Sequence, residues 1–155
     1  MKLYRLALSR YISDLTGTGA RLYGGRWNDR GTPVIYTSES RALAALEYLV
    51  HTPLALIPDD LALMELGVPD DAEITEVDAV KLPPDWRTYP PTGATVVIGE
   101  GWAHSGETLL LKVPSAVVTG EFNYLINPAH PGFSRIVPGK PEPFGFDARL
   151  ISVRS

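Results

Sequence analysis

Residues 31–51 read GTPVIYTSESRALAALEYLVH and carry the clearest local signals in the chain. Residues 33–37 (PVIYT) form a short β-rich run between turn-forming residues, which predicts a strand. A helix is predicted over residues 40–51, with Ser38 or Ser40 as its N-cap. The change of pattern within one stretch indicates a fold that combines strands and helices.

Short apolar and β-branched runs separated by turn signals fill much of the remaining chain. Strands are predicted at residues 2–7, 61–67, 74–80, 108–113, 115–119, 122–126 and 148–153. A second helix, containing Gly99 and Gly101, is predicted over residues 92–104, and residues 9–28 are expected to form a long glycine-rich connection. Many strands, two helices and no regular βαβ alternation favour an α+β fold around a mixed sheet.

Length and composition limit the classes of protein to consider. The 155 residues fit a single domain spanning residues 1–155, and 45% hydrophobic residues suffice for one packed core. A formal charge of −4 gives no basic field, so direct nucleic-acid binding is not expected. The absence of cysteine excludes a disulfide framework, a thiolate zinc site and a cysteine nucleophile.

Neither targeting nor metal binding is indicated by the sequence. The first residues, MKLYRLALSRY, contain too short an apolar run for a signal peptide, and no stretch reaches the length of a membrane span. We therefore expect a soluble, cytoplasmic protein that does not associate with a membrane. The histidines at 51, 104 and 130 lack metal-ligand spacing, so no metal site is expected.

Residues 22–28, LYGGRWN, combine an aromatic residue, two glycines, an arginine, a tryptophan and an asparagine. Glycines allow a ligand to approach the backbone, arginine forms bidentate contacts with phosphate, and aromatic rings offer stacking faces. The combination is typical of a nucleotide-binding loop. The structural alternative is a turn with a partly buried Trp27 and a surface Arg26.

Glu47 is a candidate functional carboxylate at the edge of the predicted helix. At 100° per residue it lies beside an apolar stripe, and His51 follows one turn later on the same side. The stripe consists of Ala42, Ala45, Leu46, Leu49 and Val50. The alternative is an ordinary boundary glutamate paired with Arg41 or Arg26.

Residues 113–127, VPSAVVTGEFNYLIN, place serine and asparagine side chains among turns. Ser115 follows a proline at a predicted strand start, and Asn123 and Asn127 lie further along. Such residues commonly serve turns and caps. No G-x-S-x-G elbow surrounds Ser115, so it is not predicted to be a hydrolase nucleophile.

Together these stretches resemble the RES domain, a family named for its arginine, glutamate and serine. Five matching segments occur in the same order over nearly the whole chain. They are LYRL at 3–6, YGGRWN at 23–28, GTPVIYTSESRALAALEYLVH at 31–51, LPPDWRTYPP at 82–91 and VPSAVVTGEFNYLINPAHPGF at 113–133.

The resemblance implies a fold similar to ADP-ribosyltransferases of the diphtheria-toxin type, with a mixed sheet beside an NAD⁺ cleft. It implies the toxin of a type II toxin–antitoxin system, with an Xre-type antitoxin as partner. RES toxins deplete NAD⁺ or transfer its ADP-ribose to a protein, so NAD⁺ is the expected substrate and no other cofactor is required. A homodimer remains open.

The resemblance also assigns roles to residues. The family's arginine corresponds to Arg5, with Arg26 as a second candidate, and Tyr36 takes the place of the aromatic residue at the nicotinamide site. Glu47 corresponds to the glutamate and Ser115 to the serine. The further residues expected to contact NAD⁺ are Tyr23, Trp27, Asn28, Ser38 and Asn123.

Three other functions remain open beside NAD⁺ breakdown by hydrolysis or phosphorolysis. One is ADP-ribosylation of a cellular protein, although the helical positions around Glu47 carry no second acidic residue, which favours breakdown. Another is a non-catalytic module that keeps a nucleotide pocket. The third, a plain α+β interaction domain, leaves the LYGGRWN loop unexplained.

Overall fold

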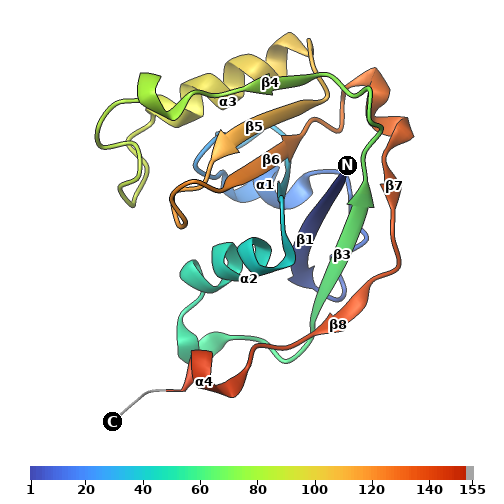
Figure 1. Ribbon diagram of the computed structural model, residues 1–155, viewed down its shortest axis with the longest axis vertical. Helices are drawn as coiled ribbons and strands as arrows, with labels where there is room; N and C mark the ends of the chain where they lie inside the picture. Colours follow the sequence, from blue (N-terminus) through green and yellow to red (C-terminus); the bar gives the residue numbers. More distant parts are fainter. Residues whose placement is uncertain (153–155) are drawn as a thin grey trace.

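One β-sheet with helices packed around it makes up the computed structural model, which describes residues 1–152 (Figure 1). The strands are β1 (Lys2–Leu8), β2 (Ile35–Ser38), β3 (Leu61–Gly67), β4 (Ile74–Glu76), β5 (Leu110–Pro114), β6 (Phe122–Ile126), β7 (Val137–Pro138) and β8 (Glu142–Phe144). The α-helices are α1 (Thr18–Tyr23), α2 (Arg41–Val50), α3 (Ala94–Ser105) and α4 (Ala148–Ile151). Single 3₁₀ turns lie at η1 (Leu54–Leu56), η2 (Ala79–Lys81) and η3 (Pro131–Arg135).

The strand order is β4-β5-β6-β2-β1-β3-β7, and β8 also pairs with β3. Strands β4 and β5 are parallel, whereas the other described pairs are antiparallel, so the sheet is mixed. The predicted α+β class is therefore confirmed.

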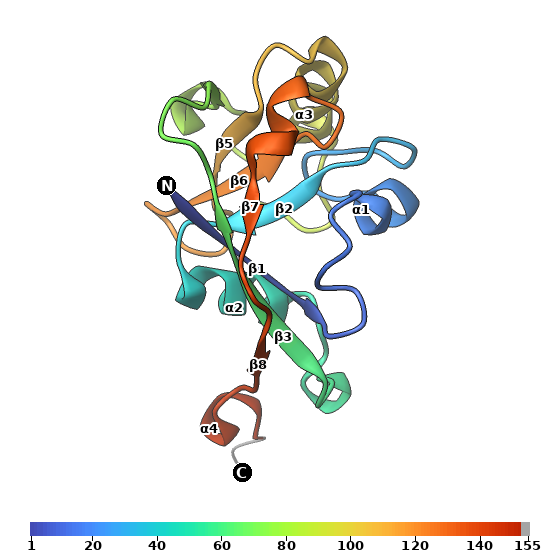
Figure 2. The same cartoon turned by 90° about the vertical axis from the view of Figure 1, so that its right-hand side faces the viewer.

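The sheet changes direction where β1 meets β2. A single residue pair, Tyr4 with Ser38, joins these strands, whereas β1 and β3 pair along their whole length. Strands β1 and β3 consequently run steeply across the direction of β5 and β6, and β2 crosses near β1 (Figures 1 and 2). Helix α2 contacts both β1 and β2 and so lies at the bend.

Two apolar clusters form the core, because alternate side chains of a strand point to opposite faces. In β2, Ile35 belongs to the first cluster and Tyr36 packs against the second. The first contains Leu3, Ile12, Ile35, Ala62, Met64, Leu66, Val68, Leu109, Leu110, Tyr124, Ile126 and Ile136. The second contains Trp27, Val34, Leu82, Trp86, Trp102, Leu111, Val113 and Leu125.

Both predicted helices and most predicted strands are present. The Ser40 hydroxyl caps α2 by accepting a hydrogen bond from the Leu43 amide at 3.0 Å. Helix α3 requires glycine at position 99, because a Cβ there would lie 1.7 Å from the Trp27 carbonyl oxygen. This close approach presses α3 against the glycine-rich segment.

The strand predicted at residues 115–119 is wrong, because this segment is a turn. The Ser115 hydroxyl accepts hydrogen bonds from the amides of Val117 and Val118, which removes those amides from any ladder. Gly120 then adopts φ +88°, which directs the chain into β6.

Two further strand predictions are wrong in whole or in part. Within residues 148–153, Ala148–Ile151 forms α4, whose N-cap Asp147 accepts from the Arg149 amide, and Val153 lies outside the described residues. Within residues 74–80 the strand ends at Glu76, because the Asp78 carboxylate caps the 3₁₀ turn η2. In both places a local side-chain cap competes with strand pairing.

The apolar stripe predicted for α2 is also wrong. Leu43 and Ala44 are buried, whereas Leu46 is 40% and Val50 58% exposed. Leu43 and Glu47 are four residues apart and share a face, so the observed rotation turns Glu47 inward rather than leaving it at the edge.

Besides α4 and the 3₁₀ turns, three described elements were not predicted, namely α1 inside the connection over residues 9–28, and strands β7 and β8. Helix α1 lies between Gly17 and Gly24, both with positive φ. Strands β7 and β8 are short and contain proline, which hides them from pattern analysis. No helix among residues 1–152 is long and apolar enough to cross a membrane.

Candidate active site

A cavity of about 700 Å³ lies between α2, the ends of β2 and β6, and the glycine-rich segment 23–30. Its volume is in the range of pockets that bind small molecules and cofactors. Eight of the ten residues predicted from the sequence line it, from four separate parts of the chain. They are Tyr23, Arg26, Trp27, Asn28, Tyr36, Ser38, Glu47 and Asn123.

Glu47 is held in a fixed orientation by two hydrogen bonds to one oxygen. Its Oε1 accepts from the Ser115 hydroxyl at 2.7 Å and from the Asn123 amide nitrogen at 2.5 Å. Among the described residues no donor reaches Oε2 of this cavity-lining side chain. The carboxylate is therefore oriented by the protein while keeping one oxygen for a ligand.

Ser115 does not line the cavity, yet it contacts the residue that does. Its hydroxyl accepts from the amides of Val117 and Val118 at 3.1 and 3.0 Å and donates to Glu47. The side chain is buried, and its single proton is used in the bond to Glu47. Its geometry suits orientation of the carboxylate and not nucleophilic attack.

Asn123 is oriented by the strand opposite. Ser38 on β2 and Asn123 on β6 are directly paired, and the Ser38 hydroxyl donates to the Asn123 side-chain oxygen at 2.7 Å. This bond turns the amide nitrogen of Asn123 toward Glu47. Ser38, Asn123 and Glu47 thus form one connected chain of hydrogen bonds.

Arg26 is half-buried at the cavity and anchored at one nitrogen. Its Nη1 donates to the carbonyl oxygens of Trp86 and Thr88 at 2.6 and 3.1 Å. Burial lowers the pKa of the Arg26 guanidinium, while the negative charge of Glu47 acts in the opposite direction. Arginine remains charged after such a shift, so the cavity holds a fixed cation close to a carboxylate.

Tyr36 forms the inner wall beside the glycine-rich segment. Its hydroxyl donates to Asn28 Oδ1 at 2.7 Å and accepts from the Trp27 amide at 3.1 Å. A Cβ at Gly25 would lie 2.6 Å from this hydroxyl oxygen, so a larger residue would disturb it. Burial raises the pKa of Tyr36 well above its ordinary value, which keeps the ring neutral.

Trp27 and Asn28 mainly support the loop. Trp27 is buried in the second core cluster, with its ring 6.4 Å from that of Trp86. The amide nitrogen of Asn28 donates to the carbonyl oxygens of Ala20, Asp29 and Thr32, which closes the segment on itself. Tyr23, in contrast, is 78% exposed at the rim.

The RES domain family model matches residues 2–147. The chain belongs to this family. It is 39% identical over 156 residues to a protein of Photorhabdus laumondii named Toxin Res, with 99% of each chain covered. It is 41% identical to a Sphingobium protein named Prs ADP-ribosylating toxin, covering 89% of this chain and 87% of that one.

The fold of this RES domain also matches a solved structure. A chain from the crystal structure of the M. tuberculosis MbcT-MbcA toxin-antitoxin complex superposes with a TM-score of 0.69 at 20% identity. The match covers 92% of this RES domain and 83% of that chain. At this level of identity the likeness establishes a shared fold.

Arg5, like Ser115, does not line the cavity of the RES domain, and unlike Ser115 it makes no hydrogen bond to a predicted site residue among the described residues. It shares one face of β1 with Leu3 of the first core cluster and with Ala7, which packs against that cluster, whereas Tyr4 and Leu6 line the cavity from the other face. Its Nη2 donates to the Tyr11 carbonyl at 3.0 Å. Burial lowers its pKa, and Asp14 opposes the shift. Arg26 therefore replaces Arg5 as the candidate arginine.

Sequence reasoning missed several aromatic residues of the cavity. Tyr4, Tyr48 and Tyr89 all line it, and the Tyr89 ring lies 5.9 Å from that of His51, which also lines the cavity. His51 follows Glu47 by one helical turn, the spacing noted in the sequence, although no role was assigned to it there. Nothing in the local pattern marks Tyr89. No group of three or more His, Asp or Glu that could hold a metal occurs among residues 1–152.

Proposed function

We propose that this RES domain is a toxin that cleaves the nicotinamide–ribose bond of NAD⁺. The names of two relatives, Toxin Res and Prs ADP-ribosylating toxin, support the assignment to this class. The observation that carries the chemistry is the state of Glu47, with Oε1 bound by two donors and Oε2 without a partner in the described residues. Such a carboxylate is oriented before any substrate arrives.

The bond to be broken joins ribose C1′ to the nicotinamide nitrogen. Its electron pair leaves with nicotinamide, and positive charge develops on the ribose as in glycoside cleavage. A fixed carboxylate beside C1′ stabilises that charge more strongly in the transition state than in the ground state. Glu47 supplies it, and Oε2 is also placed to accept from a ribose hydroxyl.

Arg26 and Tyr36 position the rest of the substrate. With Nη1 bound to two carbonyls, Nε and Nη2 of Arg26 have no partner among the described residues and suit the NAD⁺ diphosphate. Tyr36, with Tyr23 at the rim, offers a ring face to nicotinamide. In this reaction Ser115 and Asn123 act by orienting Glu47.

Water is the proposed acceptor of ADP-ribose. A water oxygen then bonds to C1′ and one proton is released, so the products are nicotinamide, ADP-ribose and H⁺. Phosphate could accept in the same way and give a phosphorylated ADP-ribose. Transfer to a protein is the second candidate, favoured by the name of the Sphingobium relative.

Product analysis separates these reactions. Purified protein is incubated with NAD⁺ in the presence and absence of phosphate and of cell lysate, and the products are resolved by chromatography. We expect nicotinamide and free ADP-ribose, whereas ADP-ribose attached to a lysate protein would favour transfer. Bound but unchanged NAD⁺ would favour the non-catalytic nucleotide module, and no binding would refute the proposal.

Toxicity is tested in cells. Expression without an antitoxin should stop growth and lower cellular NAD⁺, because consumption of NAD⁺ is continuous. Normal growth and unchanged NAD⁺, in cells shown to contain the folded protein, would contradict the toxin assignment. A cognate antitoxin of Xre type is the proposed partner; the toxin-antitoxin complex that contains the structural neighbour supports an antitoxin as partner, and the Xre type comes from the family resemblance alone.

A further inference from the structure

The wall of the cavity that carries Arg26 is pressed against one face of α3. The buried Thr95 donates through its hydroxyl to the Arg26 carbonyl oxygen at 2.6 Å. One turn later Gly99 meets the Trp27 carbonyl so closely that no side chain fits. Helix α3 itself adds only Val96 to the cavity lining, so its contact with this segment acts on the site through the segment.

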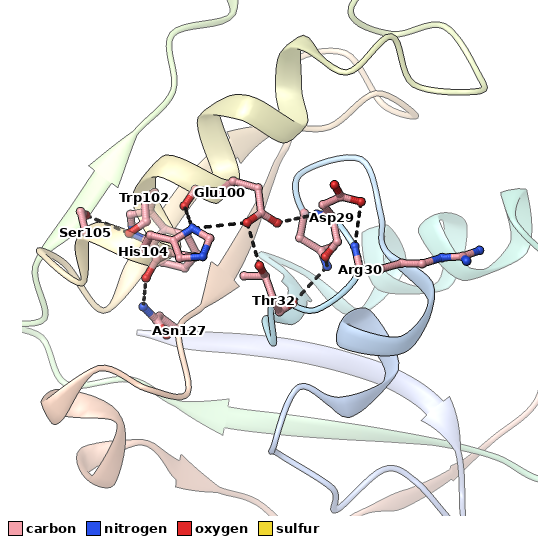
Figure 3. Close-up of polar contacts among 10 residues, drawn as sticks. Asp29, Arg30, Thr32, Glu100, Trp102, His104, Ser105 and Asn127 are labelled. Atoms are coloured by element: carbon pink, nitrogen blue, oxygen red, sulfur yellow. Dashed lines mark hydrogen bonds and ion pairs between the residues drawn. The ribbon is translucent and has the colours of Figure 1, made fainter.

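Glu100 on the same helix holds the far end of the segment, as Figure 3 shows. Its Oε1 accepts from the Asp29 amide at 2.5 Å and its Oε2 from the Thr32 hydroxyl at 2.7 Å. The Glu100 side chain is only 20% exposed. Both carboxylate oxygens are therefore engaged with one short stretch of the chain, Oε1 through the Asp29 backbone amide and Oε2 through the Thr32 side chain.

The two residues held by Glu100 are also held from the cavity side. Asn28 donates to the carbonyl oxygens of Asp29 and Thr32, and its own Oδ1 accepts from Tyr36. A continuous path of hydrogen bonds thus runs from Glu100 through the loop to the ring that forms the inner wall. Loss of the Glu100 carboxylate would remove the hydrogen bonds that hold Asp29 and Thr32 from the side of α3.

We propose that Glu100 is a positioning residue that fixes residues 26–32 for NAD⁺ binding. This inference rests on the proposed function of the same cavity. Because Glu100 acts on the segment that binds substrate and not on Glu47, it should affect affinity more than the chemical step. Hydrogen bonds to a charged group are strong enough for their loss to weaken binding about tenfold.

His104 provides a matched control on the same helix. Its Nδ1 lies 3.4 Å from Glu100 Oε2 and 2.8 Å from the Glu100 carbonyl oxygen, and the side chain is 72% exposed. Among the described residues it makes no hydrogen bond to the segment over residues 26–32. Removing His104 therefore changes the surroundings of Glu100 while leaving its hydrogen bonds to Asp29 and Thr32 intact.

The test compares Glu100→Ala, Glu100→Gln and His104→Ala by steady-state kinetics with NAD⁺. We expect Glu100→Ala to raise KM about tenfold with kcat within about threefold of wild type. Glu100→Gln keeps one acceptor for the Asp29 amide and should restore most of the affinity, and His104→Ala should match wild type. An unaltered KM with a lower kcat would show only a loss of folded protein and would overturn the proposal.

Amide hydrogen exchange measured by NMR without NAD⁺ gives an independent readout. In Glu100→Ala the Asp29 amide should exchange at least about tenfold faster, while amides of β5 and β6 keep their wild-type rates. Unchanged exchange at Asp29 would overturn the inference whatever the activity. If wild type turns over no NAD⁺ the proposed function fails, and the exchange data alone then decide whether Glu100 holds the loop.

Discussion

Replacing Glu47 by glutamine should abolish most turnover without unfolding the protein. The glutamine oxygen can accept the same two hydrogen bonds, from the Ser115 hydroxyl and the Asn123 amide, that Oε1 accepts in wild type. The glutamine nitrogen then takes the place of Oε2, which has no partner among the described residues. The substitution thus removes the charge offered to the ribose and little else.

The magnitude follows from these contacts. Loss of one preorganised electrostatic group lowers kcat by about 10²–10³, or about 2.7–4 kcal/mol of transition-state stabilisation. For stability, a hydrogen bond to a charged acceptor exceeds a neutral one by about 1 kcal/mol, so two bonds lose at most about 2 kcal/mol. In a chain of this length the Tm should fall by no more than about 4–8 °C.

The assay is nicotinamide release from NAD⁺ under single-turnover conditions, with folding checked by thermal denaturation. Glu39→Gln is the matched control, because Glu39 is exposed, does not line the cavity and accepts one hydrogen bond from the Phe122 amide. It should retain wild-type kcat. A folded Glu47→Gln protein with near-wild-type activity would refute the reasoning and mean that another carboxylate stabilises the ribose charge.

Three further predictions follow from the site. Arg26→Lys should raise KM for NAD⁺ about tenfold, because an ammonium cannot bind both the two backbone carbonyls and a diphosphate. Arg5→Lys, on the other face of β1, should leave KM unchanged, and equal KM values for both variants would contradict this prediction. Ser115→Ala should lower kcat about tenfold in the same assay with little change in KM, because it removes one of the two hydrogen bonds that orient Glu47. An unchanged kcat would mean that Asn123 alone orients the carboxylate. The antitoxin should cover the cavity between the glycine-rich loop and α2 and offer basic residues to this acidic chain, so calorimetry should show that it competes with NAD⁺. If the complex and the free toxin bind NAD⁺ with equal affinity, the antitoxin inhibits from a remote site.

The choice between Arg5 and Arg26 shows why the site could be predicted only in part. Both arginines occur in family-like segments, and the sequence offers no reason to prefer the second. The decision depends on which face of β1 meets the core, and that face is set by the pairing of β1 with β3. Sequence patterns predict that a strand exists far better than they predict its partners.

The same limit explains the errors around Glu47. Helix α2 carries apolar residues on more than one side, so periodicity selected the stripe of Leu46 and Val50 as the buried one. In the structure Leu43 and Ala44 take that place, because they face the bend between β1 and β2. The helix itself followed from local chemistry, with Ser40 as one of its two candidate caps and with bounds close to the observed Arg41–Val50, whereas its rotation depends on distant strands.

The hydrogen bonds around Glu47 also bear on the choice between NAD⁺ breakdown and transfer. Donors from two separate elements hold one oxygen, so the orientation of the carboxylate is a property of the fold and needs no acceptor. In the proposed reaction Glu47 acts on the departure of nicotinamide, which precedes either outcome, so Glu47→Gln should abolish hydrolysis and protein modification alike. We expect the difference between the two reactions to arise where an acceptor enters the cavity, beside the exposed Tyr23 and Tyr89 that line it. Substitutions there should change the ratio of free to transferred ADP-ribose while the rate of nicotinamide release stays constant.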